Sequence, residues 1–244
     1  MRHPVSIVTV THDTLFFVRL LVEKVRQFIG DRKYELVVVD RGSRDGTLEW
    51  LGEQRDVRLL KSPAGRDHTH GEAAEVGIAE AKCERVVLLD SDAHPVADDW
   101  LALTADKLDE ECRLTGAVFH RPRGKNPYGW YIHPHFMAFY RVDLGDDIIV
   151  RKIRPEFDTG EEATVRLLNA GRGVLGYPIE SSGAFNVGHA HFPTVSAGVF
   201  HAWYGTRLSK EKRSVRRETN GQVTGESYLE PLKTRLRKAY RLDY

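Results

Sequence analysis

The sequence has little cysteine, no long apolar run and no marked excess of charge of either sign. Its only cysteines are Cys83 and Cys112, which excludes a disulfide framework and predicts a reducing, cytoplasmic location. We expect both to be small buried hydrophobic residues. No apolar run approaches the roughly 18 residues of a membrane span, and no charged leader precedes the first apolar run at Val5, so we expect no signal peptide. A formal net charge of +1 gives no general attraction for nucleic acid.

Basic residues are nevertheless concentrated near the C-terminal end of the sequence. Residues 205–244 contain eleven Lys and Arg against five Asp and Glu, so this segment carries +6 and the remainder carries −5. A basic helix is expected over residues 228–242. The segment predicts peripheral contact with the anionic inner face of a membrane, and a solvated helical face is the alternative.

Strands and helices are expected to alternate over the first 95 residues. Apolar, β-branched runs predict strands at 5–10, 35–40, 57–60 and 86–89, and periodicity with turn signals predicts helices at 14–29, 47–53 and 71–82. This alternation predicts an α/β fold with a parallel, right-handed sheet whose loops gather at one edge.

The apolar run Val86 to Leu89 ends in two carboxylates, Asp90 and Asp92. Because Pro95 forbids further ladder pairing, both acids should lie at the carboxyl end of a buried strand, where open α/β sheets bind ligands. In the turn after a strand they can converge on Mg²⁺ or Mn²⁺ that also holds phosphates. The alternative is that they are turn and helix-capping residues before the segment Val96 to Glu111.

The pattern changes after residue 112. Strands are expected at 114–120, 136–142 and 174–177, and a loop rich in Pro, Gly and aromatic residues at 121–135. Asp158 should open a helix that runs to about Asn169, with Thr159 and Glu162 forming a capping box. The chain from there to the basic helix, apart from the strand at 174–177, is expected to be irregular.

Several separate stretches resemble, in order, the motifs of the family 2 glycosyltransferases over about residues 4–207. These stretches are Val5 to Asp13, Glu35 to Thr47, His70 to Ala79, Asp90-Ser91-Asp92 and Gly160-Glu161-Glu162. The resemblance implies the GT-A fold, in which a Rossmann-like, mostly parallel central sheet is flanked by helices. It also implies an inverting enzyme that moves a sugar from a nucleoside-diphosphate sugar to an acceptor hydroxyl with a divalent cation, Mn or Mg.

The resemblance assigns roles to individual residues. Glu162 would be the catalytic base with Glu161 as its neighbour, and Asp92, Asp90 and His201 would hold the metal. The residues implied to bind the nucleotide sugar are Thr11, Asp13, Asp40, Ser43, His70, Asp90, Ser91, Asp92 and Arg207.

Simpler readings exist for several of these residues. Asp40 could serve an Asx-turn, His70 could cap the following helix, and His201 could be a buried, hydrogen-bonded histidine. Either acid of the pair could serve only the helix dipole. The residues that could form a stacking platform for an acceptor sugar, or be ordinary core, are Tyr128, Trp130, Tyr131 and Trp203. We expect no zinc at His189 and His191, since no Cys or carboxylate cluster accompanies them.

Three positions depart from the family pattern. Arg41 stands where a second Asp is usual, Glu75 and Val76 replace an Arg-Asn pair, and Glu162 replaces an Asp. The first departure removes a carboxylate from the nucleoside pocket, and the last moves the base one methylene from its backbone.

The expected organisation follows from these assignments. Residues 1–207 would form one GT-A domain, with a nucleotide-sugar half at 1–95 and an acceptor half at 96–207 that binds a glycan or lipid-linked acceptor. Residues 208–244 would be a basic, helical extension. A catalytically silent nucleotide-sugar-binding protein is the alternative function. A nucleotidyltransferase is less favoured, because the chain after the first strand lacks a Gly-rich basic loop for phosphate.

Overall fold

The structure is a computed structural model of the whole chain. It describes residues 2–121, 125–145, 148–152, 154, 156–185, 193–203, 214–217, 221–224 and 228–244. Three residues considered above, Arg207, His189 and His191, lie outside the described residues.

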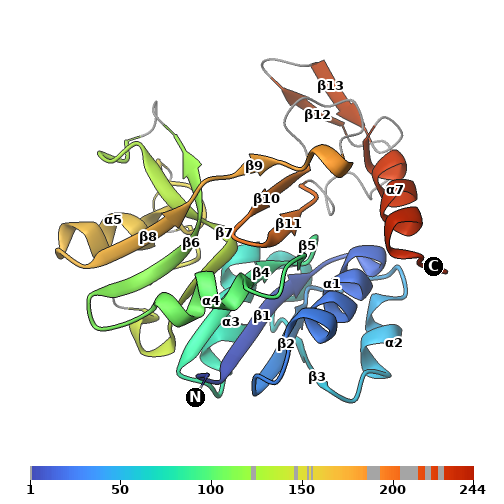
Figure 1. Cartoon of the computed structure of the whole chain (residues 1–244), viewed down its shortest axis with the longest axis horizontal. Helices are drawn as coiled ribbons and strands as arrows, with labels where there is room; N and C mark the ends of the chain where they lie inside the picture. Colours follow the sequence, from blue (N-terminus) through green and yellow to red (C-terminus); the bar gives the residue numbers. More distant parts are fainter. Residues whose placement is uncertain are drawn as a thin grey trace.

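A seven-stranded sheet forms the centre of the molecule (Figure 1), in the order β3, β2, β1, β4, β7, β6, β8. The strands are β1 Val5–Thr11, β2 Tyr34–Asp40, β3 Val57–Lys61, β4 Arg85–Asp90, β6 Cys112–His120, β7 Trp130–Tyr140 and β8 Gly173–Tyr177. The first four in this order are parallel, β7 runs antiparallel to both β4 and β6, and β8 is parallel to β6. The predicted α/β fold with a mostly parallel central sheet is confirmed.

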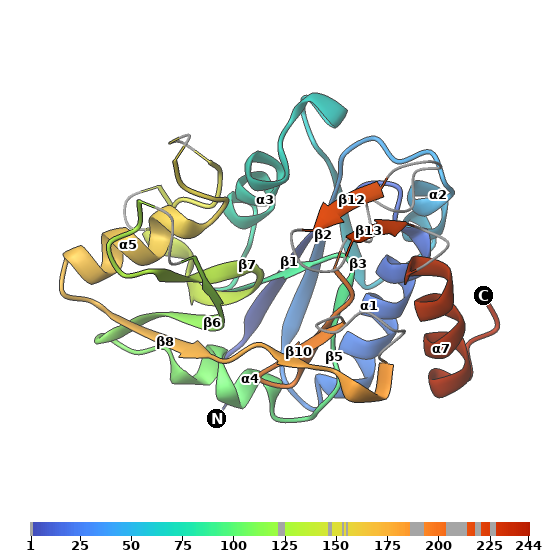
Figure 2. The same cartoon turned by 90° about the horizontal axis from the view of Figure 1, so that it is seen from above.

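Helices cover both faces of this sheet (Figure 2). They are α1 Leu15–Phe28, α2 Thr47–Gly52, α3 His70–Ala79, α4 Trp100–Leu103 and α5 Glu161–Asn169, and a further helix, α7 Glu230–Tyr240, packs on α1. Alternate residues of β1 enter different cores: Ile7 packs with α1 and α4, whereas Val8 packs with α3 and α5. The buried strands are apolar on both faces for this reason, as parallel sheets require.

A second, four-stranded sheet was not predicted. Its order is β5, β11, β10, β9, and its strands are β5 Ala93–Pro95, β9 Glu180–Ser181, β10 Thr194–Ser196 and β11 Val199–His201. The prediction that Pro95 ends ladder pairing is wrong, because Pro95 lies opposite Val199 in the antiparallel pair of β5 and β11. β5 is an edge strand, where a missing N–H removes no obligatory bond. Irregular chain was expected after the strand at 174–177. That expectation is wrong where β9, β10 and β11 lie.

Other boundaries also differ from prediction. β7 begins at Trp130, so residues 130–135 of the expected loop are strand. The segment 96–111 holds only α4 and a short 3₁₀ turn at Ala105–Lys107. The capping box lies at Thr69 and Glu72, before α3. The box predicted for α5 is absent because Gly160, with φ +75°, is its N-cap and the Glu162 side chain pairs with arginines instead. Both cysteines are half-buried rather than fully buried.

The basic C-terminal helix is confirmed as α7, and it packs on α1. Leu232 and Leu236 are fully buried against Phe17 and Leu20 of α1. A short ribbon of β12 Ser214–Arg217 and β13 Gly221–Thr224 precedes it, where irregular chain was expected. In the described part of the chain, no helix combines the length and apolarity that crossing a membrane requires.

Helix α3 packs closely on the sheet at Gly77, and this packing can be tested by substitution. A Cβ at Gly77 would meet Val8 Cγ1 at 2.6 Å and Val39 Cγ2 at 2.7 Å. Gly77→Ala should therefore lower the free energy of unfolding by about 1–3 kcal/mol, the usual cost of overpacking. Gly52→Ala in α2, where no atom lies within 4 Å of the new methyl, is the control. Urea unfolding of the two variants should separate them, and equal stability would contradict this packing.

Candidate active site

A group of three ligating side chains lies at the carboxyl end of β4. Asp90 is the last residue of β4, Asp92 follows it, and His201 ends β11. His201 Nε2 lies 3.1 Å from Asp92 Oδ1 and 3.5 Å from Asp90 Oδ2. One potential ligand atom from each residue lies within 4.8 Å of the others. Pairing of β5 with β11 creates this group, and the Ala202 N–H donates to the Asp92 carbonyl at 2.9 Å.

The charges of this group are strongly coupled. Burial alone would lower the pKa of His201, but the carboxylates of Asp92 and Asp90 raise it to about 9. Burial would raise the pKa of Asp90, yet His70 and His201 together hold it well below its usual value. His70 reaches Asp90 Oδ1 at 3.2 Å. The two carboxylates therefore concentrate negative charge, which the imidazole of His201 offsets.

This donor set fits a divalent cation. Two carboxylates and an imidazole are suitable ligands for Mn²⁺, and carboxylates with substrate phosphates suit Mg²⁺. Helix capping does not account for Asp90 and Asp92, because the next helix, α4, has Asp99 at its N-cap. The position also agrees with the general location of ligands at the carboxyl ends of strands in α/β sheets.

Two histidine rings of β7, those of His133 and His135, pack next to His201. These contacts were not predicted from the sequence. The His135 ring stacks on His201 with centroids 4.3 Å apart and planes 6° apart, and His133 Nδ1 lies 2.8 Å from His135 Nδ1. Burial lowers the pKa of His133 to about 4 and that of His135 well below its usual value. The alternation His133-Pro134-His135 is a strand signal that lay within the expected loop.

The edge formed by β1 and β2 holds several of the predicted nucleotide-binding residues. Asp40 Oδ1 accepts from the N–H groups of Gly42 at 2.7 Å and Ser43 at 2.9 Å, so the Asx-turn is present. Asp13, with φ +54°, accepts from the Arg44 N–H at 2.7 Å, and its own N–H donates to Ser43 Oγ. These contacts bring the ends of β1 and β2 into one turn system.

A chain of hydroxyl groups connects this edge to the acidic motif. Thr11 Oγ1 lies 2.8 Å from Thr14 Oγ1, which donates to Ser91 Oγ at 3.1 Å. Thr11, Ser91 and Asp92 thus lie close together across β1 and β4, which are paired in parallel.

Two departures from the family pattern have structural roles. The Arg41 guanidinium donates to the carbonyl groups of His68 and Arg66, so it holds the loop before α3. Glu75 Oε1 accepts from the N–H groups of Val150 and Arg151, each at 2.9 Å. Both side chains fix loops around the site.

Glu161 and Glu162, the acidic pair at the start of α5, are buried, and each forms an ion pair with arginine. Glu161 Oε2 accepts from Arg121 Nη1 and from the Asp158 N–H, each at 2.7 Å. Glu162 Oε1 lies 3.2 Å from Arg166 Nε and 3.3 Å from Arg154 Nη2. Among the described residues, the second oxygen of each carboxylate has no hydrogen-bond partner. One oxygen of each acid is thus buried without a hydrogen-bond partner among the described residues.

Contacts through β7 place the start of α5 near the His201 group. A Cβ on Gly160 would lie 3.1 Å from Pro134 Cδ, and Pro134 separates His133 from His135. Tyr131 Oη donates to Asp158 Oδ2 at 3.2 Å. The acids and the ligating group therefore flank the same strand.

Comparison with known sequences relates this site to other proteins. The family model described as Glycosyl transferase family 2 matches residues 6–160. The chain is 35% identical over 129 residues to the uncharacterized protein y4gI of Sinorhizobium fredii (strain NBRC 101917 / NGR234), over 50% of this chain and 14% of that protein. The chain thus matches only a small part of that relative's length.

The fold is similar to those of several solved structures. The mannosyltransferase PcManGT from Pyrobaculum calidifontis, in complex with GDP-Man and Mn²⁺, has a TM-score of 0.56 and 22% identity, over 73% of this chain and 55% of that one. Glucosyl-3-phosphoglycerate synthase from Mycobacterium tuberculosis, with Mn²⁺, UDP and phosphoglyceric acid, has a TM-score of 0.54 and 16% identity, over 72% and 68%. TarS 1-349 of S. aureus has a TM-score of 0.52 and 20% identity, over 70% and 57%. The predicted GT-A fold is confirmed.

Proposed function

Because the chain belongs to glycosyl transferase family 2, we propose that it moves a sugar from a nucleoside-diphosphate sugar to an acceptor hydroxyl with inversion. The observation that carries this proposal is the group of Asp90, Asp92 and His201 at the carboxyl end of β4. Its donor set suits a divalent cation that also binds a diphosphate. Structures of the same fold that contain Mn²⁺ with GDP-Man or UDP support the choice of ligand.

We assign distinct roles to the residues around this group. Asp90, Asp92 and His201 would hold the cation, which supplies charge neutralisation for the departing diphosphate. Glu162 takes the proton of the acceptor hydroxyl, and Glu161 with Arg121 fixes the start of α5. The residues proposed to bind the nucleotide sugar are Thr11, Asp13, Asp40, Ser43, His70, Ser91 and Arg207. A glycan or a lipid-linked saccharide would be the acceptor.

A donor screen tests the proposed function. UDP-, GDP- and dTDP-sugars would be mixed with the chain in Mn²⁺ or in EDTA, and thermal unfolding recorded. A ligand at 100 times its dissociation constant stabilises the folded form by about 2.7 kcal/mol, so a bound donor should raise the melting temperature only when the cation is present. A screen in which no donor shifts the transition with Mn²⁺ would refute the assignment.

We also propose that α7 holds the protein at an anionic membrane surface. Its apolar face is buried on α1, whereas Arg235, Lys238 and Arg241 are exposed. Each basic residue near such a surface contributes about 1 kcal/mol, and salt screens the effect. Replacing all three by Ala should therefore weaken binding to phosphatidylserine vesicles by about 100-fold at low salt.

Co-sedimentation measures this binding, with neutral phosphatidylcholine vesicles as the control. Wild-type protein that stays in the supernatant with anionic vesicles at low salt would contradict the membrane role. Equal sedimentation of the triple variant would show that other residues make the contact.

A further inference from the structure

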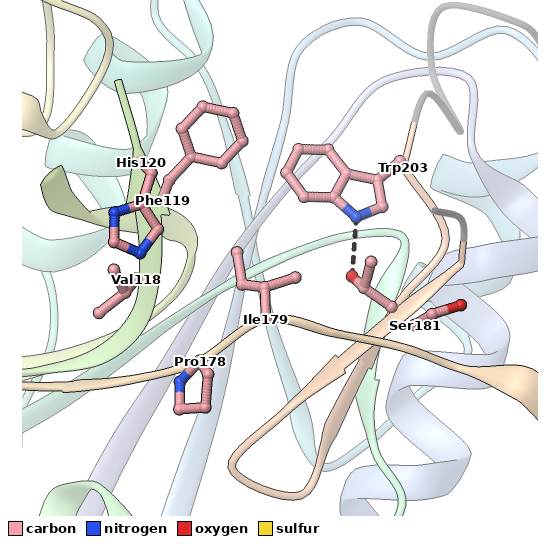
Figure 3. A pocket seen from close by; sticks show the side chains of 8 residues that line it. Val118, Phe119, His120, Pro178, Ile179, Ser181 and Trp203 are labelled. Atoms are coloured by element: carbon pink, nitrogen blue, oxygen red, sulfur yellow. Dashed lines mark hydrogen bonds between the residues drawn. The ribbon is translucent and has the colours of Figure 1, made fainter. Parts of the chain in front are cut away.

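A cavity of about 270 Å³ lies between the edge of the central sheet and the second sheet (Figure 3). The residues that line it come from β6, from the link between β8 and β9, and from β9, β10 and the end of β11: Val118, Phe119, His120, Pro178, Ile179, Ser181, Thr194 and Trp203. Nothing in the roles assigned above uses this space. Its volume is just below the range of about 300–1,000 Å³ for drug-sized ligands, which suits a single sugar unit.

Trp203 is held in an unusual conformation beside this cavity. Its φ is +60°, a left-handed value that is an outlier for a bulky residue and persists only where surrounding contacts fix it. The indole Nε1–H donates to Thr194 Oγ1 at 2.8 Å, as Figure 3 shows. Its ring centroid lies 4.3 Å from that of His201 and 6.0 Å from that of Phe119. Trp203 thus connects the ligating group to the wall of the cavity.

Aromatic contacts continue from this wall to the acidic pair. The Phe119 ring lies 5.8 Å from Tyr131, whose hydroxyl donates to Asp158, three residues before Glu161. The cavity is therefore connected to the His201 group through Trp203, and to the segment that leads into α5 through Phe119 and Tyr131. A ligand in it would contact Trp203 and Phe119, the two rings from which these connections start.

The described lining of the cavity has few polar side chains. It contains no Lys, Arg, Asp or Glu, and its polar groups are the hydroxyls of Ser181 and Thr194 and the ring of His120. A phosphate or carboxylate group placed here would lose water and would find no Lys or Arg side chain among these residues. A neutral sugar instead offers C–H faces to aromatic rings and hydroxyls to a few polar side chains.

We propose that this cavity binds a neutral sugar unit of the acceptor, with Trp203 and Phe119 as its apolar walls. The inference rests on the proposed glycosyl transfer and adds a substrate class to it. Under this proposal the acceptor of this chain differs in charge from the phosphoglyceric acid in the structure of the mycobacterial synthase, which is an anion.

Saturation-transfer NMR on the full chain with Mg²⁺ and UDP or GDP tests the proposal. The probes are methyl glycosides of glucose, galactose, mannose and N-acetylglucosamine, against glucose 6-phosphate, glucuronate and 3-phosphoglycerate. At least one neutral glycoside should receive saturation through its ring C–H protons, and the anionic probes should not. Trp203→Ala should weaken that binding at least about tenfold, Trp203→Phe less, and Phe119→Ala measurably.

Trp50→Ala is the matched control, because Trp50 is a half-buried tryptophan of α2 that faces the Arg19 guanidinium and is not among the residues that line the cavity. Unchanged glycoside binding in Trp203→Ala, a preference for the anionic probes, or no binding of any neutral glycoside would overturn the proposal. Thermal stabilisation by nucleotide and cation, measured on the same samples, shows whether each variant is folded. If nucleotide and cation do not stabilise even the wild-type chain, the proposed function itself is contradicted, rather than the role of the cavity.

Discussion

Glu162→Gln should reduce the rate of sugar transfer by about 10² to 10⁴, the usual contribution of a general base. Glutamine keeps the shape of the side chain but cannot accept the proton of the attacking hydroxyl. Donor affinity should stay nearly the same, because the loss would occur only in the transition state. Arg154 and Arg166, the partners of Glu162, are 52% and 36% exposed, so both can remain hydrated and the fold should survive.

Glu161→Gln is the matched control for this experiment. Glu161 is fully buried and paired with Arg121, so the variant should lose less activity and more stability than Glu162→Gln. The kcat, the donor dissociation constant and the melting temperature of both variants show which of the two acids is the base. If Glu161→Gln is inactive and Glu162→Gln is active, the two roles are exchanged. If both turn over normally, the base lies elsewhere.

Asp92→Asn should abolish the part of nucleotide binding that depends on the cation. The substitution removes one of two carboxylates, and it removes the closer partner of His201, at 3.1 Å. Calorimetric titration of UDP and GDP, in Mn²⁺ and in EDTA, measures the effect. Asp99→Asn, at an exposed acid seven residues along the chain, should bind as wild type. Equal nucleotide affinity of Asp92→Asn with and without Mn²⁺ would show that the cation is not held here.

The central sheet could be predicted because its signals are local. The apolar runs of β1, β2 and β4 are buried on both faces, and each ends in a polar residue at the same edge. The acids of the site, Asp90 and Asp92, could be found for that reason.

The rest of the site depends on contacts between distant segments. His201 lies 109 residues from Asp92, and the two meet through β5 and β11, strands of three residues each that are too short to show a periodic pattern. The stacking of His135 on His201 depends on where β7 begins. The start of β7 was not predicted because Pro134, a residue type common in turns, lies near it in the sequence. The role of Trp203 as a cavity wall is likewise set by tertiary packing, since its neighbours come from three other strands.

Product analysis of the wild-type chain tests the central claim most directly. A donor that stabilises the protein would be incubated with Mg²⁺ or EDTA and a panel of neutral saccharides, and its anomeric proton followed by NMR. The account predicts release of nucleoside diphosphate only with the cation, together with a new glycosidic signal of inverted anomeric configuration. Donor that binds with the cation but is not consumed in the presence of any acceptor would indicate a silent binding protein. A product of retained configuration would contradict the inverting mechanism.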